Sequence, residues 1–475
     1  MADLLKVGAR NISEKAIPMM SDMSGVLAVT DSGRYVPYRG MNVIEEVAAK
    51  RKFIKSKYIE SEAVLLGNGE DMLSGWTYAT SETYGVDLDA NVNDGGGYSA
   101  RMHTSESSSS YTPQIVFSEP QDFSPFDHLH MWIHSDDLSK FEWFSVVFEC
   151  PDASNRYKIR ESASISPIKE MSAIFGDGEV AFQKADFVAT GSPDWSNVKR
   201  VYITMRANTA GVEASINIAN MRMIKQKPKN AKIIMRMDDG LRSVYDVARP
   251  ILKKYNIPGT IFVNPEWIAT DGSHKLHPAY GGTHEAMNLD EIRELHDMGW
   301  TVCSHTYNHN LYFDPTVEKS ASYPRRYYSQ AYHDLAATQD WLIKNGFGDG
   351  AESHVYGNHY YNDETMKAAT DIMVADYSAH PIYSPYSPLP WARSIMHLGA
   401  ERFVEKTDDT YPVIDTLLER GGLCVPMFHR FDGDNLEGSV SGETLDAVLE
   451  YICSKENLDI ITAADLAYAT PAALF

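Results

Sequence analysis

The stretch "IIMRMDDG", Ile233 to Gly240, combines the pattern of a buried strand with two adjacent carboxylates. Its apolar start predicts a strand, and Asp238, Asp239 and Gly240 close it. Two neighbouring acids repel each other, and burying both without compensation is very costly. A solvated Asp-Asp-Gly turn is therefore the simplest interpretation, and a metal site needs support from the surrounding sequence.

Strand-like and helical runs alternate after this stretch. "LRSVYDVARPILKKYN" has a helical pattern, "GTIFV" is strand-like, "NLDEIRELHDMG" is helical and "WTVCSH" is strand-like again. Alternation of this kind predicts a parallel α/β sheet or barrel. Catalytic residues of such folds gather at the carboxyl ends of the strands, which is where Asp238 and Asp239 are expected.

A second predicted strand also ends in residues that bind metals. In "SHTYNH", His305 and His309 are spaced so that one helical turn would present both imidazoles to the same ion. The spacing is weak on its own, because surface histidines often share it by chance. A carboxylate together with paired imidazoles is, however, typical of an open zinc site with room for water. The strand ends together therefore indicate a metal site.

Composition limits the kinds of protein this chain can be. Its 475 residues predict more than one domain, and 43% hydrophobic with 23% charged residues is typical of a soluble globular chain. A net charge of -22 argues against nucleic acid or an anionic membrane as partner. The four cysteines lie far apart, so no disulfide framework or thiolate zinc site is expected. The first residues lack the apolar core of a signal peptide, and no run is long enough to span a membrane.

The chain is predicted to be multidomain, with three parts. Residues 1–60 mix short apolar pieces with a charged helical segment and are interpreted as an attachment or assembly element. Residues 61–226 contain strand-like runs such as "HLHMWIHS" and "KRVYITMRA" between turn residues, which predicts an all-β sandwich. Residues 227–475 form the α/β part.

From about residue 232 to 470 the chain resembles the polysaccharide deacetylases, the family-four carbohydrate esterases. "MRMDDG" with its following helix and strand is similar to the family's first motif, and "SHTYNH" is similar to the second. "HVYGNHYYND" resembles the third motif in a divergent form, and "VPMFHR" resembles the late motif that carries a histidine. The resemblance implies a distorted (β/α) barrel that removes acetyl groups, N- or O-linked, from a surface polysaccharide.

Roles for the first two motifs follow from this resemblance. It implies that Asp239, His305 and His309 bind a divalent metal, with Zn2+ foremost and Co2+, Ni2+ or Mn2+ as alternatives. Asp238 would stay off the metal as the general base. The cation would then lower the cost of holding two adjacent carboxylates.

The later motifs imply the remaining groups and also show departures. A backbone N–H near Tyr356 or Gly357 would stabilise the oxyanion, and His429 would protonate the leaving group. The family's third motif normally supplies an arginine that orients the base, and "HVYGNHYY" has none. Arg393 in "LPWARSIM" is the candidate for this role, although a surface ion pair explains it equally well. Arg236 in the first motif is unexpected unless it faces outward.

Other features allow more than one interpretation. Three loop histidines could line the cleft but are more often solvated; they are His274, His277 and His284. The closing strands of the β part resemble jelly-roll carbohydrate-binding modules, and a structural spacer is the alternative. The competing function is a catalytically degenerate barrel that only binds polysaccharide, and the missing third-motif arginine favours it. A glycoside hydrolase would leave the histidines without a role.

The cellular setting is predicted from the absence of a signal. A bacteriophage virion protein, carried on the tail and presenting a deacetylase to host polysaccharide, accounts for an export-independent enzyme with residues 1–60 as docking element. The alternatives are secretion without a cleaved signal, a trimmed signal, or a cytoplasmic enzyme. Tail proteins and a homo-oligomer are the expected protein partners, beside acetylated polysaccharide.

Overall fold

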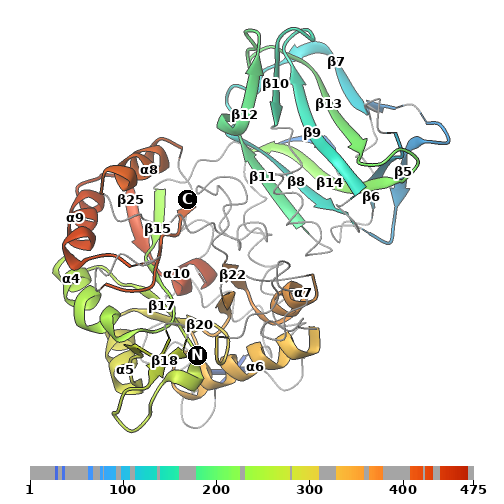
Figure 1. Ribbon diagram of the computed structural model, residues 1–475. Helices are drawn as coiled ribbons and strands as arrows, with labels where there is room; N and C mark the ends of the chain where they lie inside the picture. Colours follow the sequence, from blue (N-terminus) through green and yellow to red (C-terminus); the bar gives the residue numbers. More distant parts are fainter. Residues whose placement is uncertain are drawn as a thin grey trace. The chain divides into compact units, whose positions relative to one another are not determined.

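The protein is described from a computed structural model. The structure describes residues 27–29, 35–37, 63–67, 75–78, 80–92, 98–106, 113–135, 140–159, 178–224, 231–278, 281–309, 328–357, 363–377, 407–420, 423–431 and 439–468. These residues belong to two compact units, a β unit within residues 59–227 and an α/β unit that includes most of the chain from residue 228 onward (Figure 1). No helix within the described ranges is long and apolar enough to cross a membrane.

The β unit consists of two antiparallel sheets, drawn as adjacent layers in Figure 1. The first has the order β12 (Phe187–Thr190), β10 (Arg156–Ile159), β9 (Phe141–Glu149), β13 (Val198–Ala207), β7 (Gln114–Gln121) and β4 (Trp76–Thr77). The second has the order β11 (Gly178–Gln183), β8 (His128–His134), β14 (Ala214–Ile224), β6 (Ser99–Thr104) and β5 (Tyr84–Asp89), and β3 (Ala63–Gly67) also pairs with β14. Outside the β unit, a hairpin that is grouped with the α/β unit joins β1 (Leu27–Val29) to β2 (Tyr35–Pro37).

The core of the β unit follows from the alternation of side chains along its strands. In β8, Leu129, Met131 and Ile133 are buried on one face. The Phe182 ring on β11 contacts the Phe187 ring on β12 across the sheets, with centroids 6.5 Å apart. The all-β character predicted for this part of the chain is therefore observed.

The opposite face of β8 buries histidines, which makes the stability of this unit depend on pH. Burial lowers the pKa of His128 to about 3, and nearby His130 adds to the effect. The unfolded chain, with a histidine pKa near 6.5, therefore takes up the proton first as the pH falls. Between about pH 8 and pH 5, His128 alone is expected to lower the free energy of unfolding by about 2 kcal/mol.

Urea unfolding of the wild type and His128→Asn at both pH values measures this contribution. The variant is expected to lose about 2 kcal/mol less than the wild type on acidification. An equal loss in both proteins would show that His128 does not titrate on unfolding.

The α/β unit is built on parallel strands. Its main sheet has the order β22 (Ala375–Tyr377), β21 (Ser353–Val355), β20 (Thr301–Ser304), β17 (Thr260–Val263), β16 (Arg236–Met237) and β24 (Met427–Phe428). In a separate three-stranded sheet, β15 (Ala231–Ile234) lies between β23 (Leu423–Cys424) and β25 (Leu458–Ile461). A small hairpin joins β18 (Leu276–His277) and β19 (His284–Glu285). Among the described strands the main sheet is open, because β22 and β24 are its edges, and these strands form a half-barrel.

Helices follow the strands and cover the sheet. They are η6 (Val244–Ala248), α4 (Arg249–Lys254), η7 (Pro265–Trp267), α5 (Leu289–Asp297), α6 (Tyr328–Lys344), α7 (Asp363–Ile372), α8 (Thr407–Arg420), α9 (Gly442–Cys453) and α10 (Ala463–Tyr468). A capping box starts α5, where the Asn288 side chain accepts from the backbone of Glu291 and the Glu291 side chain accepts from Asn288 N–H. One apolar core of strand and helix residues, including fully buried Trp300, holds the unit together. This core fixes the strand ends, where the candidate site lies.

Candidate active site

Asp238 and Asp239 directly follow β16 and lie in the interior of the α/β unit. Both side chains are buried, with 0% and 1% of their surface exposed, so the solvated turn is the wrong interpretation. Asp239 and Gly240 have left-handed φ values of 69° and 64°, which turn the chain sharply after the strand. A Cβ at Gly240 would lie 3.1 Å from Val263 Cγ1, so the turn is also tightly packed against β17. Because of this tight turn, the side chains of Asp238 and Asp239 contact different neighbours.

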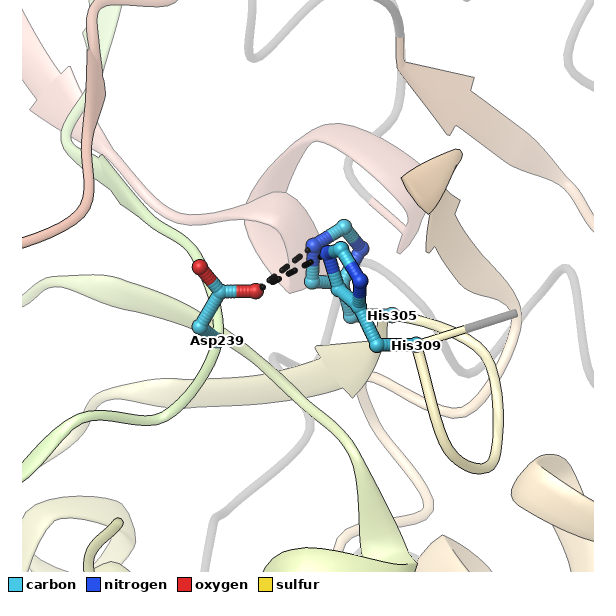
Figure 2. A group of neighbouring side chains, drawn as sticks. All are labelled: Asp239, His305 and His309. Carbon is cyan, nitrogen blue, oxygen red and sulfur yellow. Dashed lines mark ion pairs between the residues drawn. The ribbon is translucent and has the colours of Figure 1, made fainter. Parts of the chain in front are cut away.

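Asp239 meets the histidines of the second motif (Figure 2). His305 Nε2 lies 3.1 Å and His309 Nε2 lies 3.3 Å from Asp239 Oδ1, as the dashed lines in Figure 2 show. All potential ligand atoms of this group are within 4.8 Å of one another. Asp239 and His305 are buried and His309 is partly buried. The structure therefore brings together the residues predicted to bind the metal.

A loop, rather than the expected helical turn, pairs the imidazoles. Thr306 and His309 have φ values of 66° and 60°, which no right-handed helix contains. Asn264, just after β17, donates from Nδ2 to the carbonyl oxygens of His305 and Thr306, the latter at 3.1 Å. His305 and His309 are thus paired as predicted, but by a loop that backbone strain and the Asn264 hydrogen bonds hold, and not by a helical turn.

The donor atoms of this group fit a divalent transition metal. His305 Nδ1 lies 3.1 Å from the Val355 carbonyl oxygen, which is an acceptor only, so Nδ1 carries the proton and the Nε2 lone pair is directed to the group. Burial lowers the pKa of His309 to about 4, which keeps it neutral as a ligand must be. Burial raises the pKa of Asp239, but the hydrogen bond that His305 donates and the charges that His309 and His305 carry when they are protonated outweigh it and hold that pKa well below 3.8. Two imidazoles and one carboxylate are a donor set that suits Zn2+.

Asn264 is expected to control metal affinity. Asn264→Leu removes the bonds to the His305 and Thr306 carbonyls at similar volume, which loosens the loop that carries both histidines. Loss of such an outer hydrogen-bond partner is expected to weaken Zn2+ binding about 10- to 100-fold. Competition with a chromophoric chelator measures the Kd, and Asn345→Leu, which removes only the cap at the end of α6, is the control. Equal Kd values in both variants would contradict the role of Asn264.

Asp238 is held by an arginine that the sequence argument had set aside. Arg236 Nε donates to Asp238 Oδ1 at 2.8 Å, and Nη2 donates to Oδ2 at 2.5 Å. Arg236 has 0% of its surface exposed, so it does not face outward, and its pair with Asp238 accounts for an arginine at this position. Strand residues i and i+2 share a face, so the two side chains are placed side by side. Arg393, the predicted partner of the base, lies outside the described residues.

His429 and the third-motif residues lie at neighbouring strand ends. His429 follows β24, and Asp238 N–H donates to the Phe428 carbonyl oxygen at 2.8 Å, which places His429 next to the acids. Burial lowers the pKa of His429, while the charges of Asp239 and Asp238 oppose the shift. Tyr356 and Gly357 directly follow β21 and are buried, beside the strand that carries His305.

The three loop histidines differ in their surroundings. His277 is fully buried; its Nε2 lies 3.2 Å from Asn264 Oδ1 and its ring contacts the His309 ring edge-on, with centroids 5.7 Å apart. The solvated interpretation is wrong for His277, because the β18–β19 hairpin folds it against the metal group. His284 Nε2 lies 3.2 Å from Arg430 Nη1. His274 Nε2 lies 3.0 Å from Glu291 Oε1.

Sequence reasoning missed the supporting contacts of the site. Arg236 holds Asp238, Asn264 holds the histidine loop, and His277 packs against His309. For Arg236 a signal was present, since a strand puts residues two apart on the same face. For Asn264 and His277 no local pattern exists, because both act on residues more than thirty positions away in the chain.

These strand-end residues define a class of protein, and comparison with known families identifies it. Residues 225–375 match the family model described as "Polysaccharide deacetylase". Residues 225–375 are therefore similar to the polysaccharide deacetylases.

Two curated relatives are named for a single polymer substrate, poly-beta-1,6-N-acetyl-D-glucosamine. A poly-beta-1,6-N-acetyl-D-glucosamine N-deacetylase of Staphylococcus epidermidis is 29% identical over 147 residues, which are 30% of this chain and 47% of the relative. Its counterpart in Staphylococcus aureus strain N315 is 26% identical over 146 residues, 30% of this chain and 46% of the relative. The matches thus span less than half the length of these curated relatives. The solved Xyl-CE4 domain of a multidomain xylanase from the hindgut metagenome of Trinervitermes trinervoides is 13% identical, with TM-score 0.31, covering 50% of this chain and 89% of that domain.

Proposed function

We propose that this protein is a metal-dependent deacetylase of a surface polysaccharide. The observation that carries the proposal is the grouping of Asp239, His305 and His309 directly beside a second buried acid, Asp238, and near His429. A polysaccharide-binding surface has no use for adjacent buried carboxylates next to a histidine pair, because burying them costs free energy that binding does not recover.

Asp239, His305 and His309 would hold the metal. A divalent ion at this place supplies a Lewis acid for the acetyl carbonyl and lowers the pKa of the attacking water. The direction of the His305 lone pair and the neutral state of His309 support this assignment. Zn2+ is the proposed ion, with Co2+, Ni2+ and Mn2+ as alternatives.

The chain's own groups then move the protons. Asp238 takes a proton from the attacking water as the new carbon–oxygen bond forms, and it is not one of the grouped ligands. His429 donates a proton to the leaving nitrogen or oxygen as the bond to the acetyl carbon breaks, which yields acetate and the free amine or hydroxyl. A backbone N–H near Tyr356 or Gly357, at the neighbouring strand end, donates to the oxyanion.

The named relatives suggest an N-acetylglucosamine polymer as substrate. Poly-β-1,6-N-acetylglucosamine is therefore the first polymer to test, beside peptidoglycan, chitooligosaccharides and acetylated capsular polymers. Metal-stripped protein and protein restored with Zn2+ are run in parallel, and released acetate is measured. Acetate that depends on the metal is expected from at least one polymer. Tight binding of a polymer without acetate release would instead establish the receptor-binding function.

The wider architecture is also a proposal. We propose that the half-barrel closes as the distorted barrel of the family, and that the β unit is a jelly-roll carbohydrate-binding module that keeps polymer near the site. Residues 1–60 are proposed to attach the enzyme to a bacteriophage tail. Mass spectrometry of purified virions is expected to detect the chain, and its absence from them would contradict this setting.

A further inference from the structure

Arg236 is a buried cation inside the catalytic half-barrel, and only a strong interaction can compensate for its burial. It lies on β16 with 0% of its surface exposed, and the Phe262 ring of the neighbouring strand lies 5.7 Å from its Cζ. An unpaired guanidinium at such a place would cost several kcal/mol. Its fork-like pair with Asp238 uses both carboxylate oxygens, which is the strongest geometry available to an arginine.

The pair determines which way the Asp238 carboxylate faces. Because each oxygen accepts from a different guanidinium nitrogen, the carboxylate plane is fixed relative to β16. Without this clamp Asp238 could turn toward the imidazoles that gather around the adjacent Asp239. Arg236 therefore separates the two neighbouring acids into one that faces the histidines and one that does not.

We infer that Arg236 is the positioning residue that fixes Asp238 as the general base and keeps it off the metal ligands. This inference rests on the proposed function. It places the orienting arginine on β16, two residues before the base, so that one short segment, residues 236–239, supplies orienting residue, base and metal ligand. The missing arginine in the third motif then no longer favours a catalytically degenerate protein.

Kinetics of a double-mutant cycle test the inference on the full chain. The proteins are the wild type, Arg236→Met, Asp238→Asn and the double variant, loaded with Zn2+ and assayed for kcat and KM of acetate release. Arg236→Met is expected to lower kcat about 100-fold. KM is expected to stay within about twofold, because a side chain with no exposed surface does not touch polymer. The double variant is expected to be no slower than Asp238→Asn, since Arg236 acts only through Asp238.

Arg236→Lys provides the conservative variant and a second cycle. A lysine keeps the charge but cannot make two parallel bonds, so kcat is expected to fall about 10-fold. If Arg236→Met does not fold, as judged by its circular dichroism, the cycle is run with Arg236→Lys and Arg236→Lys/Asp238→Asn. Near-normal kcat in the arginine variants, or losses that multiply in the double variant, would overturn the inference.

Cobalt binding separates this inference from the proposed function. In Arg236→Met loaded with Co2+, the freed Asp238 is expected to turn to the ion and change its visible spectrum, whereas the double variant keeps the wild-type spectrum. Identical spectra in all proteins would mean that Asp238 never approaches the ion, and the separating role of Arg236 would be wrong. An inactive wild type that still shows the spectral change would reject the proposed function and retain the role of Arg236.

Discussion

Asp238→Asn is expected to lower kcat by about 10²- to 10⁴-fold while leaving metal binding unchanged. The amide keeps the size of the carboxylate and can still accept a bond from Arg236, but it cannot take a proton from water. The metal remains because the grouped ligand atoms belong to Asp239, His305 and His309.

Asp239→Asn is the matched control, since it makes the same chemical change one residue later. It removes a charge that the histidine pair faces directly, at 3.1 Å and 3.3 Å, so both activity and bound Zn2+ are expected to be lost. Acetate release and metal content by plasma mass spectrometry, measured on the same dialysed samples, separate the two variants. Loss of metal in Asp238→Asn would show that the two acids share the ligand role.

Gly350→Ala is expected to destabilise the α/β unit by about 3 kcal/mol or more, or to prevent its folding. A Cβ at Gly350 would lie 2.0 Å from the carbonyl oxygen of Val302 on β20, which is backbone and cannot move without disturbing the strand that leads to His305. The cost therefore comes from a clash with the sheet itself.

Gly346→Ala tests whether space or backbone conformation matters in this loop. Gly346 has a φ of 93° but no atom within 4 Å of an added Cβ, so only backbone strain of about 1 to 2 kcal/mol is expected. Thermal unfolding followed by circular dichroism compares the two variants. Similar midpoints for both would show that the close approach of Gly350 to β20 is relieved at little cost.

The arrangement of the strands was predictable from local patterns. Alternating strand-like and helical runs after Ile233 required a parallel sheet, and parallel strands share one carboxyl edge. Acids and histidines at the ends of two such runs therefore had to lie near each other. This reasoning pointed to both acids and both histidines, whereas only the resemblance to polysaccharide deacetylases distinguished Asp239, which the structure groups with His305 and His309, from Asp238.

Local structure within the site was less predictable. The spacing of His305 and His309 suggested a helical turn, whereas left-handed residues and the bonds from Asn264 form a loop. The solvated turn expected for two adjacent acids is a buried, strained one. In both places long-range contacts override the preference of the local sequence, as is common at functional sites.

By itself, then, the sequence of this protein determined the order of its elements, the acids and histidines that suit a metal site, and the strand ends that carry them. These are properties of short segments, because hydrophobic period and residue type act locally. Only the tertiary structure decided that Arg236 faces inward to hold Asp238, that Asn264 shapes the histidine loop and that His277 is buried against His309. Each of these depends on which side of a strand, or which distant loop, meets the site once the core has packed. A buried charge or hydrogen bond is favourable only when its partner is in place, and that partner comes from the fold.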